Sequence, residues 1–93
     1  MRMAICLNYE LVKIRGTVAE YRFGNCLSDL DGIFEIDLPK LIGGEISMEA
    51  PISEVVRLKN ISQSQAMANR VFGKIYKHFL EHNEYPSKGG YYA

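Results

Sequence analysis

The sequence predicts an α+β domain in which one long C-terminal helix covers one face of an antiparallel sheet. Two observations carry this prediction. In the first two-thirds of the chain, apolar residues alternate with polar ones over three stretches, as in half-buried strands. In the last third, apolar residues recur every three or four positions, as in an amphipathic helix. We expect three to five strands within about residues 4–60 and one helix over about residues 63–84, with all 93 residues in a single domain.

The first two strands are predicted to form a hairpin. In AICLNYELVKI (4–14), alternate apolar side chains share one face: Ile5, Leu7, Tyr9 and Leu11. The apolar parity switches after Leu11, which predicts a bulge or a strong twist there. Gly16 provides a tight turn, and Ala19, Tyr21 and Phe23 then mark one face of the returning strand.

A loop rich in turn-forming residues (25–32) leads into the third strand, GIFEIDL (32–38). In this strand Phe34, Ile36 and Leu38 are predicted to face inward, with Glu35 and Asp37 outward. Pro39 ends the strand or marks it as an edge. We further expect a turn at Gly43-Gly44, a short strand in EISM (45–48), and a strand rather than a helical turn over EVVRLKN (54–60).

The helix is predicted from its apolar stripe, which comprises Ala68, Val71, Phe72, Ile75 and Phe79. Arg70, Lys74, Lys77 and Glu81 lie on the opposite side. The spacing of Ser62 and Gln65 predicts a capping box at the N-terminus. Pro86 is expected to stop the helix at about Tyr85. The tail SKGGYYA (87–93) is expected to fray, with packing of its aromatic residues on the sheet as the alternative.

The net charge is zero, but the signs are separated along the chain. Residues 20–54 are mostly acidic, while residues 55–80 hold basic residues and no acid. If this separation persists in the fold, the molecule has an acidic surface and a basic helix face. Alternatively, the two segments neutralise one another across the fold.

Several features bear on the compartment. No apolar run approaches the ~20 residues that span a membrane, and the N-terminus lacks the apolar core of a signal peptide. The expected location is the cytoplasm. Cys6 and Cys26 lie far apart in sequence, so we expect two reduced thiols that behave as small apolar residues. A Cys–His nucleophile pair with His78 or His82 stays open as an alternative.

HFLEH (78–82) matches the H-x-x-E-H signature of zinc peptidases. On a helix, however, His82 falls on the buried side and Glu81 on the solvated side, and no third ligand stands out. We expect no metal or other cofactor, and a small metal-dependent hydrolase built on this segment is the alternative.

The sequence also argues against calcium and nucleic acid as ligands. SDLDG (28–32) resembles part of a calcium loop, but no ligating Glu follows about seven residues after Gly32, where Pro39 lies, which indicates a turn. The isoelectric point of about 6.7 argues against a dedicated nucleic-acid binder.

Two stretches, NCLSDLDGIFEIDL (25–38) and ANRVFGKIYKHFLEHNEYPSKGGYYA (68–93), resemble small bacterial immunity proteins of polymorphic or contact-dependent growth-inhibition toxin systems. The resembling ending comprises Asn83, Glu84, Tyr85, Pro86, Lys88, Tyr91 and Ala93. The resemblance implies a cytoplasmic protein that is not an enzyme. Such a protein binds one cognate toxin domain and occludes or distorts its active site.

Many such toxins are nucleases with basic clefts, and an acidic surface can take the place of phosphates in such a cleft. The candidate partner-binding residues are Asp29, Asp31, Glu35, Asp37 and Glu45. The expected partner is therefore a protein, not a nucleic acid or a membrane. A generic interaction module, which joins a larger assembly through its exposed sheet face or tail, is a further alternative.

Overall fold

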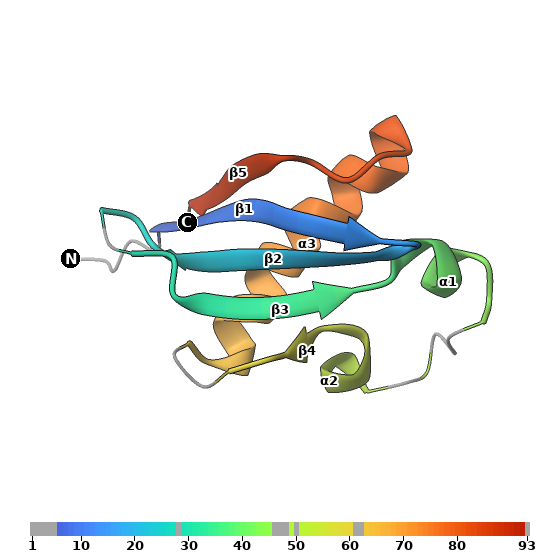
Figure 1. Cartoon of the computed structure of the whole chain (residues 1–93), viewed down its shortest axis with the longest axis horizontal. Helices are drawn as coiled ribbons and strands as arrows, with labels where there is room; N and C mark the ends of the chain where they lie inside the picture. The colour runs from blue at the N-terminus through green and yellow to red at the C-terminus, as the bar shows by residue number, and fades with distance from the viewer. Residues whose placement is uncertain (1–5, 28, 46–48, 50, 61–62, 93) are drawn as a thin grey trace.

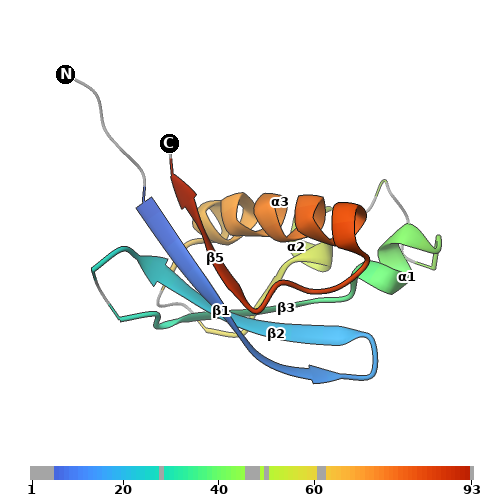
Figure 2. The ribbon, with the colours of Figure 1, turned by 90° about the horizontal axis from the view of Figure 1, so that it is seen from above.

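The computed structural model describes residues 6–27, 29–45, 49, 51–60 and 63–92, which form a five-stranded antiparallel sheet with one long helix against it (Figures 1 and 2). The strands are β1 (Cys6–Arg15), β2 (Val18–Asn25), β3 (Gly32–Ile36), β4 (Arg57–Leu58) and β5 (Lys88–Tyr92), in the order β4-β3-β2-β1-β5. The helices are α1 (Leu38–Ile42), α2 (Ile52–Val55) and α3 (Gln65–His82). The predicted α+β class and the C-terminal helix on one face are confirmed.

The β1–β2 hairpin forms as the alternation predicts. Gly16 has a φ of 63° in the turn between the strands, a conformation that costs glycine little. The register between the strands shifts between Leu11 and Lys13, which confirms the predicted irregularity. The bulge changes which side chains face α3, so Val12 and Ile14 are both left exposed near the end of the hairpin.

The core lies between α3 and the face of the sheet that it covers. Its fully buried members include Leu7, Ala19, Tyr21, Phe23, Phe34, Ile36, Ala68, Val71 and Ile75. These are the apolar positions that the period-two and helical patterns predict. Tyr21 is central, since its ring stacks on Phe34 and meets Tyr9 edge-on. Its hydroxyl donates a 2.6 Å hydrogen bond to the carbonyl oxygen of Pro86, which satisfies both buried groups.

Both ends of α3 differ from the prediction. The N-cap is Ser64, whose Oγ accepts a 3.2 Å hydrogen bond from the Met67 amide, so the predicted capping box is wrong. Ser62 lies outside the described residues. The helix ends at His82, because Asn83 adopts the left-handed conformation with a φ of 57°. This stop comes before Tyr85 and leaves Tyr85 free to turn back toward the sheet.

The segment after β3 departs from the predicted strand. Asp37 is the N-cap of α1, and Pro39 lies in the first turn of this helix, where its missing N–H costs nothing. The prediction that Asp37 faces outward is wrong, because its buried carboxylate accepts hydrogen bonds from the Lys40 amide (3.1 Å) and the Thr17 hydroxyl (2.8 Å). Leu38 is buried as predicted, but from a helix.

The region from residue 43 to 60 is only partly as predicted. The Gly43-Gly44 turn is confirmed, with a φ of 87° at Gly44. Most of EISM lies outside the described residues. The strand predicted over 54–60 is wrong for its first part, which belongs to α2, and β4 is only two residues long. Val55 and Val56 are buried at this junction, so their apolar side chains contribute to the core without a long strand.

The C-terminal tail is a strand, so the expectation of a frayed end is wrong. β5 pairs with β1 over Cys6–Glu10. Tyr91 packs against the core as the alternative predicted, while Tyr92 is exposed. Within the described residues, we find no helix that is long and apolar enough to cross a bilayer.

The two cysteines form a disulfide, which contradicts the prediction of reduced thiols. Cys6 opens β1 and Cys26 directly follows β2, and their Cα atoms lie 5.4 Å apart. The Cys26 amide also donates a 3.0 Å hydrogen bond to the Cys6 carbonyl. Residues that are 20 apart in sequence are neighbours here because the hairpin folds them together. No thiol remains for a Cys–His nucleophile pair.

Candidate protein-binding site

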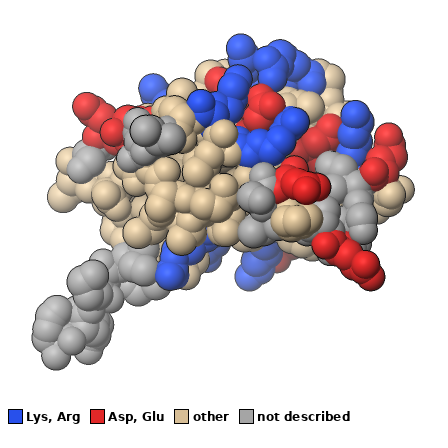
Figure 3. All heavy atoms as spheres, turned by 90° about the horizontal axis from the view of Figure 1, so that it is seen from below, with Lys and Arg blue, Asp and Glu red and all other residues tan. Residues whose placement is uncertain are grey.

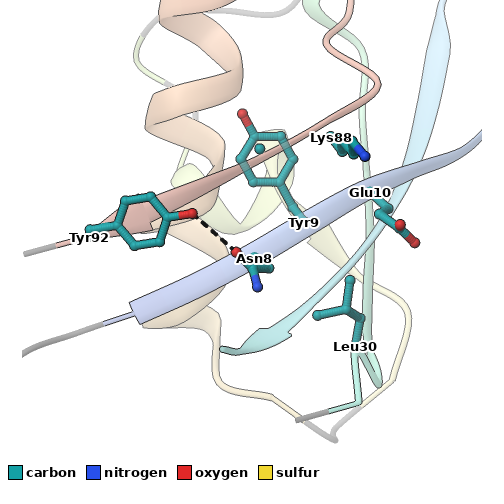
Figure 4. Close-up of a pocket in the computed structure, with 7 residues that line it drawn as sticks. Asn8, Tyr9, Glu10, Leu30, Lys88 and Tyr92 are labelled. Atoms are coloured by element: carbon teal, nitrogen blue, oxygen red, sulfur yellow. Dashed lines mark hydrogen bonds between the residues drawn. The ribbon is translucent and has the colours of Figure 1, made fainter. Parts of the chain in front are cut away.

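A hollow of about 540 Å³ lies where β1 meets β5 (Figure 4). Asn8 and Glu10 of β1, Lys88 and Tyr92 of β5, and Leu30 of the β2–β3 loop all line it. The Tyr92 hydroxyl lies 3.3 Å from Asn8 Oδ1 and donates a hydrogen bond to it. Both polar and apolar side chains line this open hollow, so it is suited to a side chain from a partner.

Two glycines allow the tyrosines to lie over β5. A Cβ at Gly89 would collide with the hydroxyl and ring of Tyr9, and one at Gly90 would collide with those of Tyr92. Each ring therefore crosses the strand directly above the glycine backbone. The KGGYY sequence, which resembles a flexible tail, is what makes close packing at this edge possible.

The loop between β2 and β3 stands beside this hollow and carries Leu27, which is fully exposed and has a φ of 65°. A single exposed leucine is common on protein surfaces, but a positive φ at a non-glycine residue is uncommon. The strain is borne by a loop that is anchored at its start by the Cys6–Cys26 disulfide. Such a residue is a candidate contact for a partner protein.

The far end of this loop is anchored by hydrogen bonds from residues that precede α3. Asn60 Nδ2 donates to the Asp31 carbonyl oxygen (2.8 Å), while its Oδ1 accepts from the Ile33 amide (3.2 Å). Gln63 Nε2 donates to Asp31 Oδ1 (2.9 Å). The start is packed as well, because a Cβ at Gly24 would lie 2.6 Å from the backbone oxygen of Asp29. The loop is therefore held on both sides, which lowers the entropy cost of binding.

The five candidate acids do not share one surface. Asp29 and Asp31 lie exposed on the β2–β3 loop, and no ion pair to either carboxylate is found in the described part of the chain. Glu45 is exposed beyond α1 and lines another hollow with Glu54 and Arg57.

The remaining two candidates are engaged inside the molecule. Glu35 is surrounded by Arg15, Arg57 and Lys59, and Asp37 is the buried cap of α1. The basic segment that contains Arg57 and Lys59 thus neutralises part of the acidic segment that contains Glu35. This is the neutralisation that the charge pattern left open.

The H-x-x-E-H segment forms the end of α3, which extends past the sheet (Figure 1). The rings of His78 and His82 lie 4.4 Å apart between centroids. His82 is exposed, which contradicts its predicted place on the buried side, because the last helical turn has no sheet beneath it. Glu81 is exposed as predicted. No group of three or more His, Cys, Asp or Glu side chains that could hold a metal occurs among the described residues.

Sequence reasoning missed the disulfide, the exposed Leu27 and the role of the tail. A signal for the disulfide does exist, since Cys6 and Cys26 are equidistant from Gly16 along the chain and therefore face each other in a hairpin. Comparison with protein-family models, with curated proteins and with solved structures finds no match to this chain.

Proposed function

We propose that this chain is a non-catalytic binding protein that neutralises a cognate toxin domain, as do the small bacterial immunity proteins that it resembles. The observation that carries the proposal is the β2–β3 loop, which presents exposed Leu27 between two anchored ends with Asp29 and Asp31 beside it. An apolar side chain flanked by unpaired carboxylates suits a basic partner surface that also contains an apolar pocket.

The charge on this loop remains available to a partner. Asp31 accepts a hydrogen bond from the neutral amide of Gln63, and no cation forms an ion pair with it among the described residues. A basic nuclease cleft is therefore a suitable target. Complementary charge accelerates association, while burial of Leu27 slows dissociation.

The first test is to look for a toxin domain encoded by the neighbouring gene, to express it and to measure binding by calorimetry. Leu27→Ala is expected to weaken binding about tenfold, because full burial of a leucine side chain is worth roughly 1.5–3 kcal/mol and about 1.4 kcal/mol is a tenfold change in affinity. Asp29→Asn with Asp31→Asn is expected to slow association and to reduce its dependence on salt. Glu81→Gln, an exposed acid on the far end of α3, is the matched control and should change neither quantity.

The outcomes separate two proposals. If the toxin binds tightly and the substitutions at Leu27, Asp29 and Asp31 leave the affinity unchanged, the interface lies elsewhere and the loop is not the binding site. Absence of binding to the neighbouring toxin, together with capture of a different defined partner, would favour a generic interaction module. Asp37 and Glu35 are unsuitable for this test because both carboxylates have structural partners inside the molecule.

The resemblance also leads us to propose the bacterial cytoplasm as the compartment, whereas a disulfide is typical of oxidising compartments. Trapping free thiols with an alkylating agent in intact cells, followed by mass spectrometry, tests the proposal. Two alkylated cysteines would support a reducing cytoplasm. A chain that remains disulfide-bonded and unmodified would argue for an oxidising location.

A further inference from the structure

We propose that the face of the sheet opposite α3 is a second interaction surface, which binds an acidic surface of a partner protein. This inference does not rest on the loop or on the immunity role. It rests on how ionic side chains from four strands are layered on that face.

The lower layer consists of two carboxylates. Glu20 on β2 lies directly opposite Glu35 on β3, and like charges in such a pair repel each other. Lys59 lies between them, with its Nζ 3.1 Å from Glu20 Oε1 and 3.6 Å from Glu35 Oε2. The two carboxylates therefore fix the position of the Lys59 ammonium group.

Two guanidinium groups complete the arrangement. Arg15 Nη2 lies 2.9 Å from Glu35 Oε2, and Arg57 Nη2 lies 2.9 Å from Glu35 Oε1. Glu35 thus holds one arginine on each oxygen. A guanidinium group has five N–H donors, so most donors of both arginines remain available to a partner.

The two signs lie at different depths. The side chains of Glu20 and Glu35 are only 12% and 14% exposed, whereas those of Arg15, Arg57 and Lys59 are 52%, 52% and 41% exposed. A partner that approaches the β2 to β4 part of this face therefore meets cations, and Glu20 and Glu35 hold these cations in place. Glu10, toward β5, is 40% exposed and is paired with Arg22. Because the cations are already ordered, binding costs less side-chain entropy.

The rest of the face has the same sign. Lys13 lies opposite Glu20, Lys88 lies opposite Glu10, and Arg22 forms an ion pair with Glu10. Among the described residues, the uncovered face carries six basic side chains, Lys13, Arg15, Arg22, Arg57, Lys59 and Lys88, against Glu10, Glu20 and Glu35. In Figure 3 this face lies along the top, where Lys and Arg gather with some Asp and Glu among them.

The surroundings favour an acidic protein over a nucleic acid. Glu45 and Glu54 share a hollow with Arg57 at one end of the sheet, and Asp29 lies exposed at the other. A long polyanion would extend over these acids, whereas a compact acidic patch would not. Tyr92 at the β5 edge is an exposed aromatic side chain on this face, and its hydroxyl is hydrogen-bonded to Asn8. The outward-facing positions described on β1 to β4, where the three cations around Glu35 lie, hold no aromatic side chain on which a base could stack.

The test uses an octaglutamate peptide as the probe, and follows the backbone amides of the whole chain by NMR. We expect the largest changes in chemical shift at the backbone amides of β1, β3 and β4, whose side chains form this face. The double substitution Arg15→Gln and Arg57→Gln should weaken binding about tenfold. It removes two guanidinium groups that can donate charge-assisted hydrogen bonds to the carboxylates of the peptide. Lys74→Gln with Lys77→Gln on the exposed side of α3 is the matched control, with the same change in charge, and should weaken binding less than about twofold.

The double substitution Arg15→Lys and Arg57→Lys is a control for misfolding. It keeps both positive charges, so a folded variant should bind the peptide with an affinity between those of the wild type and the glutamine variant. The proposal would be overturned if the glutamine double variant and the α3 control lost the same amount of affinity for octaglutamate. Shifts confined to α3 would also overturn it. Tighter binding of a DNA oligonucleotide than of octaglutamate at the same amides would replace the acidic protein with a nucleic acid.

Discussion

The two faces of the sheet are made from the same strands but have opposite physical characters. On β3, Phe34 is fully buried against α3, while its neighbour Glu35 forms ion pairs on the uncovered face. Removal of apolar surface from water is worth roughly 1.5–3 kcal/mol for a large side chain. Half-exposed ion pairs contribute about 0–1 kcal/mol. The covered face therefore supplies stability, and the uncovered face is free to determine charge.

The sharpest way to break this contrast is to truncate a buried ring. Phe34→Ala should lower the free energy of unfolding by about 3–5 kcal/mol, because it leaves a cavity beside Tyr21 and Phe23. Ile33→Ala, one position away on the other face, should cost about 1 kcal/mol or less. Denaturant unfolding of both variants measures the difference, and similar losses would refute the division between the faces.

The disulfide is the one covalent stabiliser, and Cys6 belongs to the uncovered face. Replacing Cys6 and Cys26 together with Ser should cost about 2–3 kcal/mol, because the unfolded chain regains the freedom that the closed loop removes. Thermal melts in the presence and absence of a thiol reductant check this value. The reductant should destabilise the native chain and leave the double variant unchanged. An identical effect on both would argue against the assignment.

A high-pH titration tests the tyrosine cluster where the covered face meets α1. Burial, followed by the nearby Asp37, raises the pKa of Tyr85 to about 12, although a hydrogen bond from the Leu38 amide opposes the shift. The unfolded chain loses its proton near pH 10, before the folded chain does. The contribution of Tyr85 to the free energy of unfolding should thus be fully present below pH 10 and should fall between pH 10 and 12. The loss attributable to Tyr85, which is partly exposed, is on the order of 1 kcal/mol.

Tyr85→Phe is the control for this titration. It removes the hydroxyl that donates to the Thr17 carbonyl oxygen and accepts from the Leu38 amide. The variant should be less stable at pH 7 and should show a shallower decline above pH 10. Unfolding measurements combined with tyrosinate absorbance follow both states. The same slope in the two proteins would assign the decline to other groups, Tyr21 first, whose pKa burial also raises.

The smallest expected effect concerns the ionic layer. Glu35→Gln should change the free energy of unfolding by about 1 kcal/mol or less, because its partners are half exposed. Raising the salt concentration should reduce the difference further. A loss comparable to that of Phe34→Ala would show that the uncovered face contributes to stability as well as to charge.

Patterns between near neighbours in the sequence were enough to predict the elements that form the core. The alternation around Tyr9, Tyr21 and Phe34, the turn at Gly16 and the stripe through Ile75 all appear as expected. Such patterns work because the orientation of a side chain within a strand or helix repeats over two to four residues. For the candidate site, the same reasoning placed Asp29 and Asp31 in a loop, where they lie; their role in binding stays a prediction.

The features that could not be predicted depend on contacts between distant residues. Asp37 caps α1 through the Lys40 amide, but its carboxylate is turned inward because Thr17, on the β1–β2 turn, donates to the other oxygen. The tail becomes β5 because β1 offers an open edge and the glycines of the tail let two tyrosines cross it. Glu35 is not available to a partner because Arg15 and Arg57, from other strands, form ion pairs with its carboxylate. Each of these contacts depends on how the elements pack against one another, and no local pattern records that packing.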